Sequence, residues 1–264
     1  MKKPAFLLLF ALVTQFTIAQ GWDWGGPIDP LQANYKVTHY RLELELLPET
    51  QSIKGSNTIT FSAKEKLDTI RLNLIDEYQV DKVLMDGKEV RFSHQNDILD
   101  IIPVDCTCDQ VQVFYGGKTP IAQNPPWEGG FTWEKDQLDN HWMGLSAQAE
   151  GSKIFMPAWD HPSNEPENGI DIILTAPKPY FVASNGRLID TKESDGKIIQ
   201  RIGQGHKKAC ENSRSDIREN DLSQNIQPAC PKIHGSINHR CAHLFNLRQN
   251  HQNDNRNTES DVCQ

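Results

Sequence analysis

The fold is decided by a stretch of strict alternation, Tyr40-Arg41-Leu42-Glu43-Leu44-Glu45-Leu46. Side chains of a β-strand point alternately to its two faces, so this pattern places the apolar groups on one face and the charges on the other. A helix would instead repeat its apolar positions every 3.6 residues. The stretch therefore predicts a half-buried strand, and Pro48 ends it because proline cannot donate to a ladder.

The same period of two recurs between Tyr35 and Gln200. Asp86-Gly87 has the composition of a tight hairpin turn. The pattern predicts no long helix, and short strands separated by turns are typical of an all-β fold, an antiparallel sandwich or saddle. Further strands are expected at Asn57–Phe61, Ile70–Leu74, Val80–Met85, Val90–Phe92, Ile98–Ile102, Val111–Tyr115, Ile170–Thr175 and Phe181–Ser184.

The composition changes after Gln200. Of 10 Phe, 6 Trp and 5 Tyr, only Phe245 lies beyond that point, whereas four of the six cysteines do. Such a segment cannot bury enough apolar surface to offset its ordering entropy. We expect residues 201–264 to be a disordered tail. A frameshift is our hypothesis for its origin, because the strand-like Lys197–Gln200 leads into it without a turn signal.

The amino terminus has the pattern of a secretory signal peptide. Lys2 and Lys3 precede the apolar run Ala5–Phe16, and Thr17-Ile18-Ala19 offers small residues for cleavage. The run is shorter than the about 20 residues of a membrane span, although an uncleaved anchor remains the alternative. We expect residues 1–19 to be removed, residues 20–200 to form the β domain, and the protein to be exported to the periplasm or the extracellular space.

The net charge limits the binding partners that can be expected, and the cysteines bear on the redox compartment. The formal net charge of -8 argues against nucleic acid, which requires a basic face. No membrane contact is expected after signal cleavage. In an oxidising compartment the six cysteines could pair. A disulfide between Cys106 and Cys108 would be strained, so free thiols or links to other cysteines are expected.

An aromatic stretch interrupts the strands between Thr119 and Trp142 and predicts a long loop. Trp127, Phe131 and Trp133 would either cap the open end of the sheet or contact a ligand.

The most informative motif is Gln148-Ala149-Glu150-Gly151-Ser152-Lys153-Ile154-Phe155-Met156-Pro157-Ala158-Trp159-Asp160-His161-Pro162. It resembles the late part of the N-terminal β domain of the M1 (gluzincin) zinc aminopeptidases and their epoxide-hydrolase relatives. That family carries a Gln or Glu followed at fixed offsets by a basic residue, a Pro, an Asp and a second Pro. The matching positions are Gln148, Lys153, Pro157, Asp160 and Pro162. Lys153 stands where Arg is usual, and Ala158 where Cys is common.

The resemblance extends from Tyr35 to Gln200. Tyr35–Leu44 is similar to the opening strand of the family, Gly55–Phe61 to the next one and Ser184–Leu188 to the far end of the domain.

In the family, the Gln or Glu helps to hold the free α-amino group of the peptide substrate. The resemblance assigns that role to Gln148; the alternative is a loop residue that bonds local backbone. Glu150 is a weaker second amine contact or a surface charge. Asp160 and His161, despite the nearby Glu165, lie between prolines and are expected to shape a turn rather than to form a catalytic pair.

Zinc catalysis in the intact relatives needs a helix with His-Glu-x-x-His, and this sequence contains no His-Glu dipeptide. The resemblance therefore implies a scaffolding domain that binds the peptide N-terminus, without its catalytic domain. We expect no catalytic residue, no metal ligand and no peptide hydrolysis in this chain alone, and the sequence leaves its status as an enzyme open. The alternatives are a non-enzymatic peptide- or glycan-binding module and a complete enzyme that uses Asp160, His161 and Glu150.

The cysteines and histidines beyond Gln200 are too irregularly spaced to predict a zinc site; they include Cys230, His234, His239, Cys241 and His243.

Overall fold

The computed structural model describes residues 26–104, 108–125, 127–135, 141–147, 150–204 and 246–249, the last four by their backbone. The predicted signal peptide lies outside these residues. So does the predicted tail, apart from Arg201–Gln204, which complete a strand, and Asn246–Gln249, which form another. The division into segments 1–19, 20–200 and 201–264 stays a prediction.

The described residues are mostly β, which confirms the predicted all-β fold. Their helical structure is limited to three short 3-10 turns: η1 (Gln32–Asn34), η2 (Pro48–Thr50) and η3 (Ser152–Ile154). The alternating stretch lies in a strand as predicted, and Tyr40, Leu42, Leu44 and Leu46 are all buried in the core.

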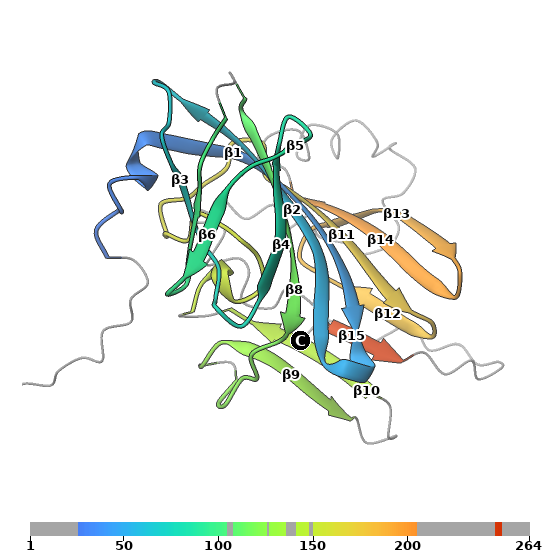
Figure 1. The fold of residues 1–264 in the computed structure, drawn as a ribbon. Coiled ribbons are helices and arrows are strands. Elements are labelled where there is room, and N and C mark those ends of the chain that lie inside the picture. The colour runs from blue at the N-terminus through green and yellow to red at the C-terminus, as the bar shows by residue number, and fades with distance from the viewer. Residues whose placement is uncertain are drawn as a thin grey trace, which may run out of the picture.

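Eight strands form the main sheet, which Figure 1 shows as the long twisted layer. In spatial order they are β13 (Arg187–Ser194), β14 (Lys197–Gln204), β11 (Ile170–Pro177), β1 (Tyr35–Leu47), β2 (Ser52–Ala63), β8 (Gln110–Lys118), β4 (Gln79–Met85) and β5 (Lys88–Glu89).

The pairing of β1 with β11 is parallel, with Tyr40 opposite Ile170 and Leu44 opposite Leu174. The main sheet is therefore mixed at this pair, while its other described strand pairs are antiparallel, as predicted. The physical reason is the connection: the chain leaves β8, builds other structure over some fifty positions, residues 119–169, and returns in the direction of β1. A parallel pair requires a crossover of this kind, and strand patterns alone do not reveal it.

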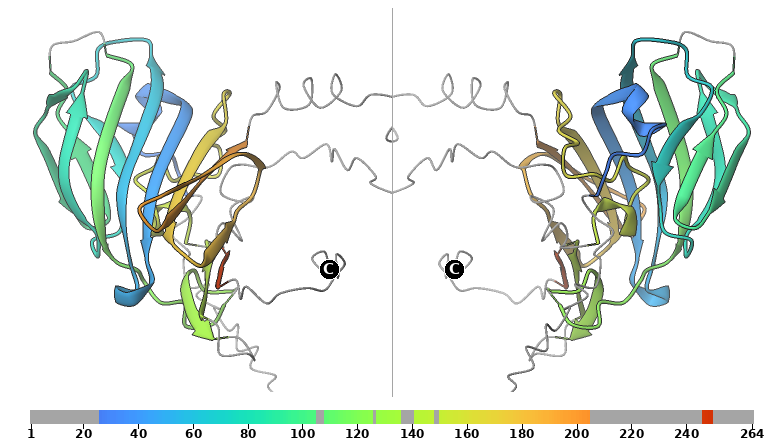
Figure 2. Two further views of the ribbon diagram at one scale, coloured as in Figure 1. Left: turned by 90° about the vertical axis from the view of Figure 1, so that its right-hand side faces the viewer. Right: turned by 90° about the vertical axis from the view of Figure 1, so that its left-hand side faces the viewer.

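Two smaller sheets complete the domain. One has the order β3 (Ile70–Asn73), β7 (Ile98–Ile101), β6 (Phe92–Gln95). The other has the order β12 (Tyr180–Ala183), β15 (Asn246–Gln249), β10 (His141–Ser146), β9 (Gly130–Lys135). Figures 1 and 2 show this four-stranded sheet beside the end of the main sheet where β1 turns into β2.

The predicted aromatic loop is in large part the hairpin β9–β10. Phe131 is fully buried, and the indole N–H of Trp133 donates to Thr119 Oγ1 at 2.9 Å. Trp127 is 63% exposed. Phe131 and Trp133 therefore contribute to packing, Trp133 is partly buried, and Trp127 is the most exposed of the three.

Cys108 is disulfide-bonded, which excludes the free thiol and leaves a link to another cysteine as the predicted alternative for this residue. Each of the other five cysteines lies outside the described residues.

Four of the five tyrosines are buried: Tyr35, Tyr40, Tyr78 and Tyr115. Burial raises the pKa of each phenol above its ordinary value of about 10. Above about pH 10 the unfolded chain loses these protons while the folded chain keeps them. Stability therefore falls as the pH rises beyond that value.

We predict that an alkaline titration followed by phenolate absorbance separates two classes. Tyr180, partly exposed, should ionise in the folded protein, and the four buried phenols only on unfolding. The loss of stability should approach about 1.4 kcal/mol per pH unit for each buried phenol. A single rapid and reversible phase containing all five tyrosines would contradict this prediction.

Candidate functional site

The motif of the sequence folds as an irregular segment, Glu150–Asn164, whose only regular structure is η3; we call it the clamped segment. Three of its carbonyl oxygens accept hydrogen bonds from buried side chains outside the segment. Asn57 Nδ2 donates to Pro157 O at 2.8 Å, Tyr78 Oη to Ile154 O at 2.9 Å, and Tyr115 Oη to Phe155 O at 2.6 Å. An irregular segment can be buried because these donors satisfy its backbone.

Backbone groups fix the same segment to β3. Asn73 and Ala158 exchange two hydrogen bonds, with N–O distances of 2.7 and 3.0 Å. The amide of Ile75 donates to Lys153 O at 3.2 Å. The clamped segment is therefore held between the main sheet and the three-stranded sheet.

Tyr40 holds the far end of the segment. Its hydroxyl oxygen accepts the Trp159 N–H at 3.1 Å and Asn164 Nδ2 at 2.8 Å. Burial raises the pKa of this phenol, and the two donated hydrogen bonds oppose the shift. The alternating stretch that decides the fold thus also supplies a side chain that positions the motif.

A tight turn opens the segment at Gly151. Its φ of +82° lies in the left-handed region that favours glycine. Its N–H donates to Ala147 O at 3.1 Å, and the next amide, of Ser152, donates to Asp160 Oδ1 at 2.7 Å. The Asp160 carboxylate lies so close to Gly151 that a Cβ there would clash with it. Asp160 therefore braces this turn.

The two candidate amine-binding residues, Gln148 and Glu150, both precede Gly151 in the sequence. Glu150 is half-buried and packs against Gly129, where an added Cβ would clash with its side chain. It forms no ion pair with a residue in the described ranges. Gln148 lies outside the described residues, while the residues around it are tied together by the Ala147–Gly151 hydrogen bond. Neither amine-binding role is tested by this geometry.

Lys153 has a structural partner. Its ammonium lies 3.1 Å from Asp97 Oδ2, and Asp97 Oδ1 accepts the Asp76 N–H at 3.1 Å. The basic residue of the motif thus ties the clamped segment to the turn before β7.

His161 bonds a residue of its own turn and the amino-terminal end of the described chain. Its Nδ1 lies 2.7 Å from Ser163 Oγ, and its Nε2 lies 2.9 Å from the carbonyl oxygen of Gly26. The Asn164 N–H donates to His161 O at 2.9 Å. These contacts agree with the predicted turn.

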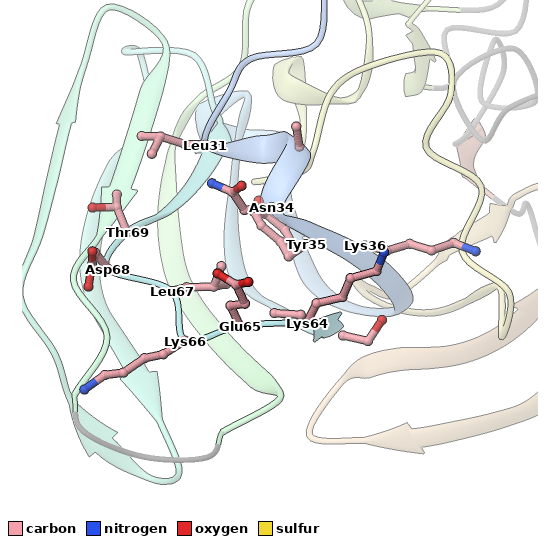
Figure 3. Close-up of a pocket in the computed structure, with 13 residues that line it drawn as sticks. Leu31, Asn34, Tyr35, Lys36, Lys64, Glu65, Lys66, Leu67, Asp68 and Thr69 are labelled. Carbon is pink, nitrogen blue, oxygen red and sulfur yellow. The ribbon is translucent and has the colours of Figure 1, made fainter.

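Two hollows of the described surface lie away from the clamped segment. One of about 700 Å³ is shown in Figure 3 and lies between the start of β1 and the β2–β3 connection, with Tyr35, Leu67 and Lys64 on its wall. Another, of about 750 Å³, lies beside Trp133, Trp142 and Tyr180. The sequence did not single out either. Glu150 lines neither of them.

The fold and the clamped motif define the β domain of a metallopeptidase. The family described as the peptidase M1 N-terminal domain matches residues 36–207, and the chain belongs to it. This confirms the resemblance found in the sequence.

Solved structures show the same fold. The M1 zinc metallopeptidase from Deinococcus radiodurans has 21% identity and a TM-score of 0.55 over 66% of this chain and 39% of its own. A mutant of that enzyme bound to Tyr-Ser-Ala has 22% identity and a TM-score of 0.54, over 66% of this chain and 40% of its own. Native leukotriene A4 hydrolase from yeast has 19% identity and a TM-score of 0.52, over 65% of this chain and 27% of its own. The chain thus spans well under half the length of these enzymes. No curated protein matches it.

The zinc of these relatives does not fit the described residues. They contain no group of three or more His, Cys, Asp or Glu side chains placed to hold a metal. The sequence as a whole also lacks His-Glu-x-x-His. No helix in the described ranges has the length and apolar character needed to cross a membrane.

We predict that Gly151→Ala destabilises the protein more than Gly196→Ala. Gly196 has a similar φ of +74° but open space around it, so its alanine variant measures the backbone cost alone, about 1–2 kcal/mol. Gly151→Ala adds the clash with Asp160, roughly 1–3 kcal/mol of overpacking. Urea unfolding of both variants measures the difference. Equal destabilisation would show that the Asp160 contact does not constrain the turn.

Proposed function

We propose that this chain is the substrate-amine-recognising and scaffolding domain of an exported zinc aminopeptidase. In this proposal Gln148, with Glu150 as a weaker contact, holds the free amino group of a peptide. Zinc and the catalytic groups belong to a catalytic domain that these residues do not form. The chain by itself then binds peptide N-termini weakly and does not cleave them.

The observation that carries the proposal is the rigid mounting of the clamped segment. Asn57, Tyr78 and Tyr115 each donate a hydrogen bond to its backbone, although it has almost no regular structure. A binding residue must be held in place if its contact is to be selective, and such support from surrounding side chains is the usual solution. The turn at Gly151, between Gln148 and the clamped carbonyls, is part of this mounting.

The chemistry of the two candidates suits an ammonium group. An amide oxygen accepts a hydrogen bond from an ammonium without the full desolvation cost of a carboxylate. A nearby carboxylate such as Glu150 adds a longer-range attraction. A relative of this fold is known in complex with the peptide Tyr-Ser-Ala, which is consistent with a peptide ligand.

Export is supported by the pattern of Lys2, Lys3 and Ala5–Phe16, which is typical of a signal peptide. The alternative of a free-standing peptide- or glycan-binding module has less support, because Phe131 and Trp133 are used in packing.

The proposal is tested by NMR titration of the chain with Tyr-Ser-Ala and with its N-acetylated form, both with zinc present. We predict that the free-amine peptide shifts the side-chain amide signal of Gln148 and the backbone signal of Glu150, and that the acetylated peptide does not. Gln148→Ala should abolish the response, whereas Gln123→Ala should preserve it because Gln123 is exposed and bonds only its own loop. The peptide should stay intact.

Equal responses to the two peptides, or a response that survives Gln148→Ala, would contradict the amine-binding role. Zinc-dependent cleavage of Tyr-Ser-Ala would contradict the proposal that the chain alone is inactive.

A further inference from the structure

Trp127 is the most exposed large apolar side chain of the described residues, with 63% of its surface accessible. Phe131 and Trp133, which follow in β9, pack against the core instead. Tryptophan offers a large, rigid contact area at a low entropic cost, and it is enriched at binding surfaces. A single exposed apolar residue needs no functional explanation by itself, so the surroundings of Trp127 decide its role.

The hairpin β9–β10 brings Trp127 to the candidate site. Gly130, the first residue of β9, pairs with Ser146, the last residue of β10. The chain before β9 and the chain after β10 therefore leave the sheet at the same end. Gly129 and Glu150 meet there, since a Cβ added to Gly129 would lie 2.4 Å from Cγ and 2.8 Å from Cβ of Glu150. Two residues of chain, at most about 7 Å, separate Trp127 from this contact.

The turn that carries Trp127 is held by hydrogen bonds of its own backbone. The N–H groups of Trp127 and Glu128 both donate to Asn124 O, at 2.9 and 3.0 Å. The end of the loop is fixed by the buried Phe131, whose N–H donates to Pro120 O at 2.7 Å. A side chain on such a turn keeps its position relative to the hairpin, as selective contact with a ligand requires.

Two carboxylates accompany the indole of Trp127. Glu128 is exposed on the same turn, and the half-buried Glu150 lies against Gly129. Both attract a positive charge to this end of the hairpin. The local chemistry therefore combines a large apolar surface with negative charge, which suits a ligand that has an ammonium group and an apolar group side by side.

We propose that Trp127 contacts the first side chain of the peptide whose amino group Gln148 and Glu150 hold, and that it selects peptides beginning with a large apolar or aromatic residue. The amino group and the first side chain branch from the same Cα atom, so a residue that reads this side chain must lie next to the amine-binding groups. Packing on the indole removes apolar surface of that side chain from water. The inference rests on the proposed function and adds the class of peptide that the domain prefers.

The probes are Tyr-Ser-Ala and Ala-Ser-Ala, which differ only in the first side chain, and each is titrated into the full chain by NMR. Tyr-Ser-Ala should shift the indole N–H signal of Trp127, which is assigned by its loss in Trp127→Ala. It should also bind about tenfold more tightly than Ala-Ser-Ala, because only the tyrosine ring can pack on the indole.

Trp127→Ala should weaken the binding of Tyr-Ser-Ala about tenfold and leave that of Ala-Ser-Ala nearly unchanged. Trp127→Phe keeps an aromatic ring and should preserve most of the preference. Leu188→Ala is the matched control, because Leu188 is an exposed apolar residue of β13, at the edge of the main sheet, and this variant should bind both peptides like the wild type.

Equal affinities of the wild type for the two peptides, or a preference that survives Trp127→Ala, would overturn the inference. So would an unchanged indole signal of the wild type saturated with Tyr-Ser-Ala, a result that does not depend on the folding of any variant. In each of these cases a shift of the Gln148 amide signal by both peptides leaves the proposed function standing. If neither peptide shifts the Gln148 signal, the proposed function fails and the inference fails with it.

Discussion

Three donors, Asn57, Tyr78 and Tyr115, satisfy buried carbonyl groups of a segment that has almost no secondary structure of its own. A carbonyl buried without a partner costs about 1–3 kcal/mol, so the clamped segment could not lie against the sheets without them. The phenols serve a second purpose because their rings fill the core, and the rings of Tyr78 and Tyr115 meet edge to face with centroids 5.7 Å apart. The packing of the core and the hydrogen bonding of the buried carbonyl groups thus depend on the same tyrosine side chains.

The need to satisfy these carbonyl groups explains how the main sheet and the three-stranded sheet are joined. The clamped segment lies between the main sheet and β3, and it occupies part of the long connection that allows β11 to pair in parallel with β1. The Gly151 turn and the Asp160 brace then fix where the chain enters it. A side chain mounted at this entry keeps its position only while the carbonyls beyond it are held. At β12, Gln200 Oε1 accepts the Val182 N–H, and β15 pairs with the strand as well.

Part of this could be predicted from the sequence. Alternation at Tyr40–Leu46 predicts a strand because its period follows from backbone geometry, and the spacing of Pro157, Asp160 and Pro162 indicates the family. The hydroxyl contacts could not be predicted, because a core tyrosine looks the same in a sequence whether or not its hydroxyl bonds a distant carbonyl. Strand β13 was missed since its eight residues are all exposed and give no apolar alternation. The parallel pair β1–β11 was missed because direction depends on the path of a connection. Gln148 stays a prediction that rests on resemblance.

The central claim is that hydroxyl groups of the core hold the clamped segment, and Tyr115→Phe tests it most directly. The substitution keeps the ring and leaves the Phe155 carbonyl without its 2.6 Å donor. Amide exchange should quicken across Ser152–Trp159 while β1 stays protected, and the free energy of unfolding should fall by about 1–3 kcal/mol. Tyr180→Phe, on a partly exposed ring, should change neither. Unchanged exchange in Ser152–Trp159 after Tyr115→Phe would contradict the account.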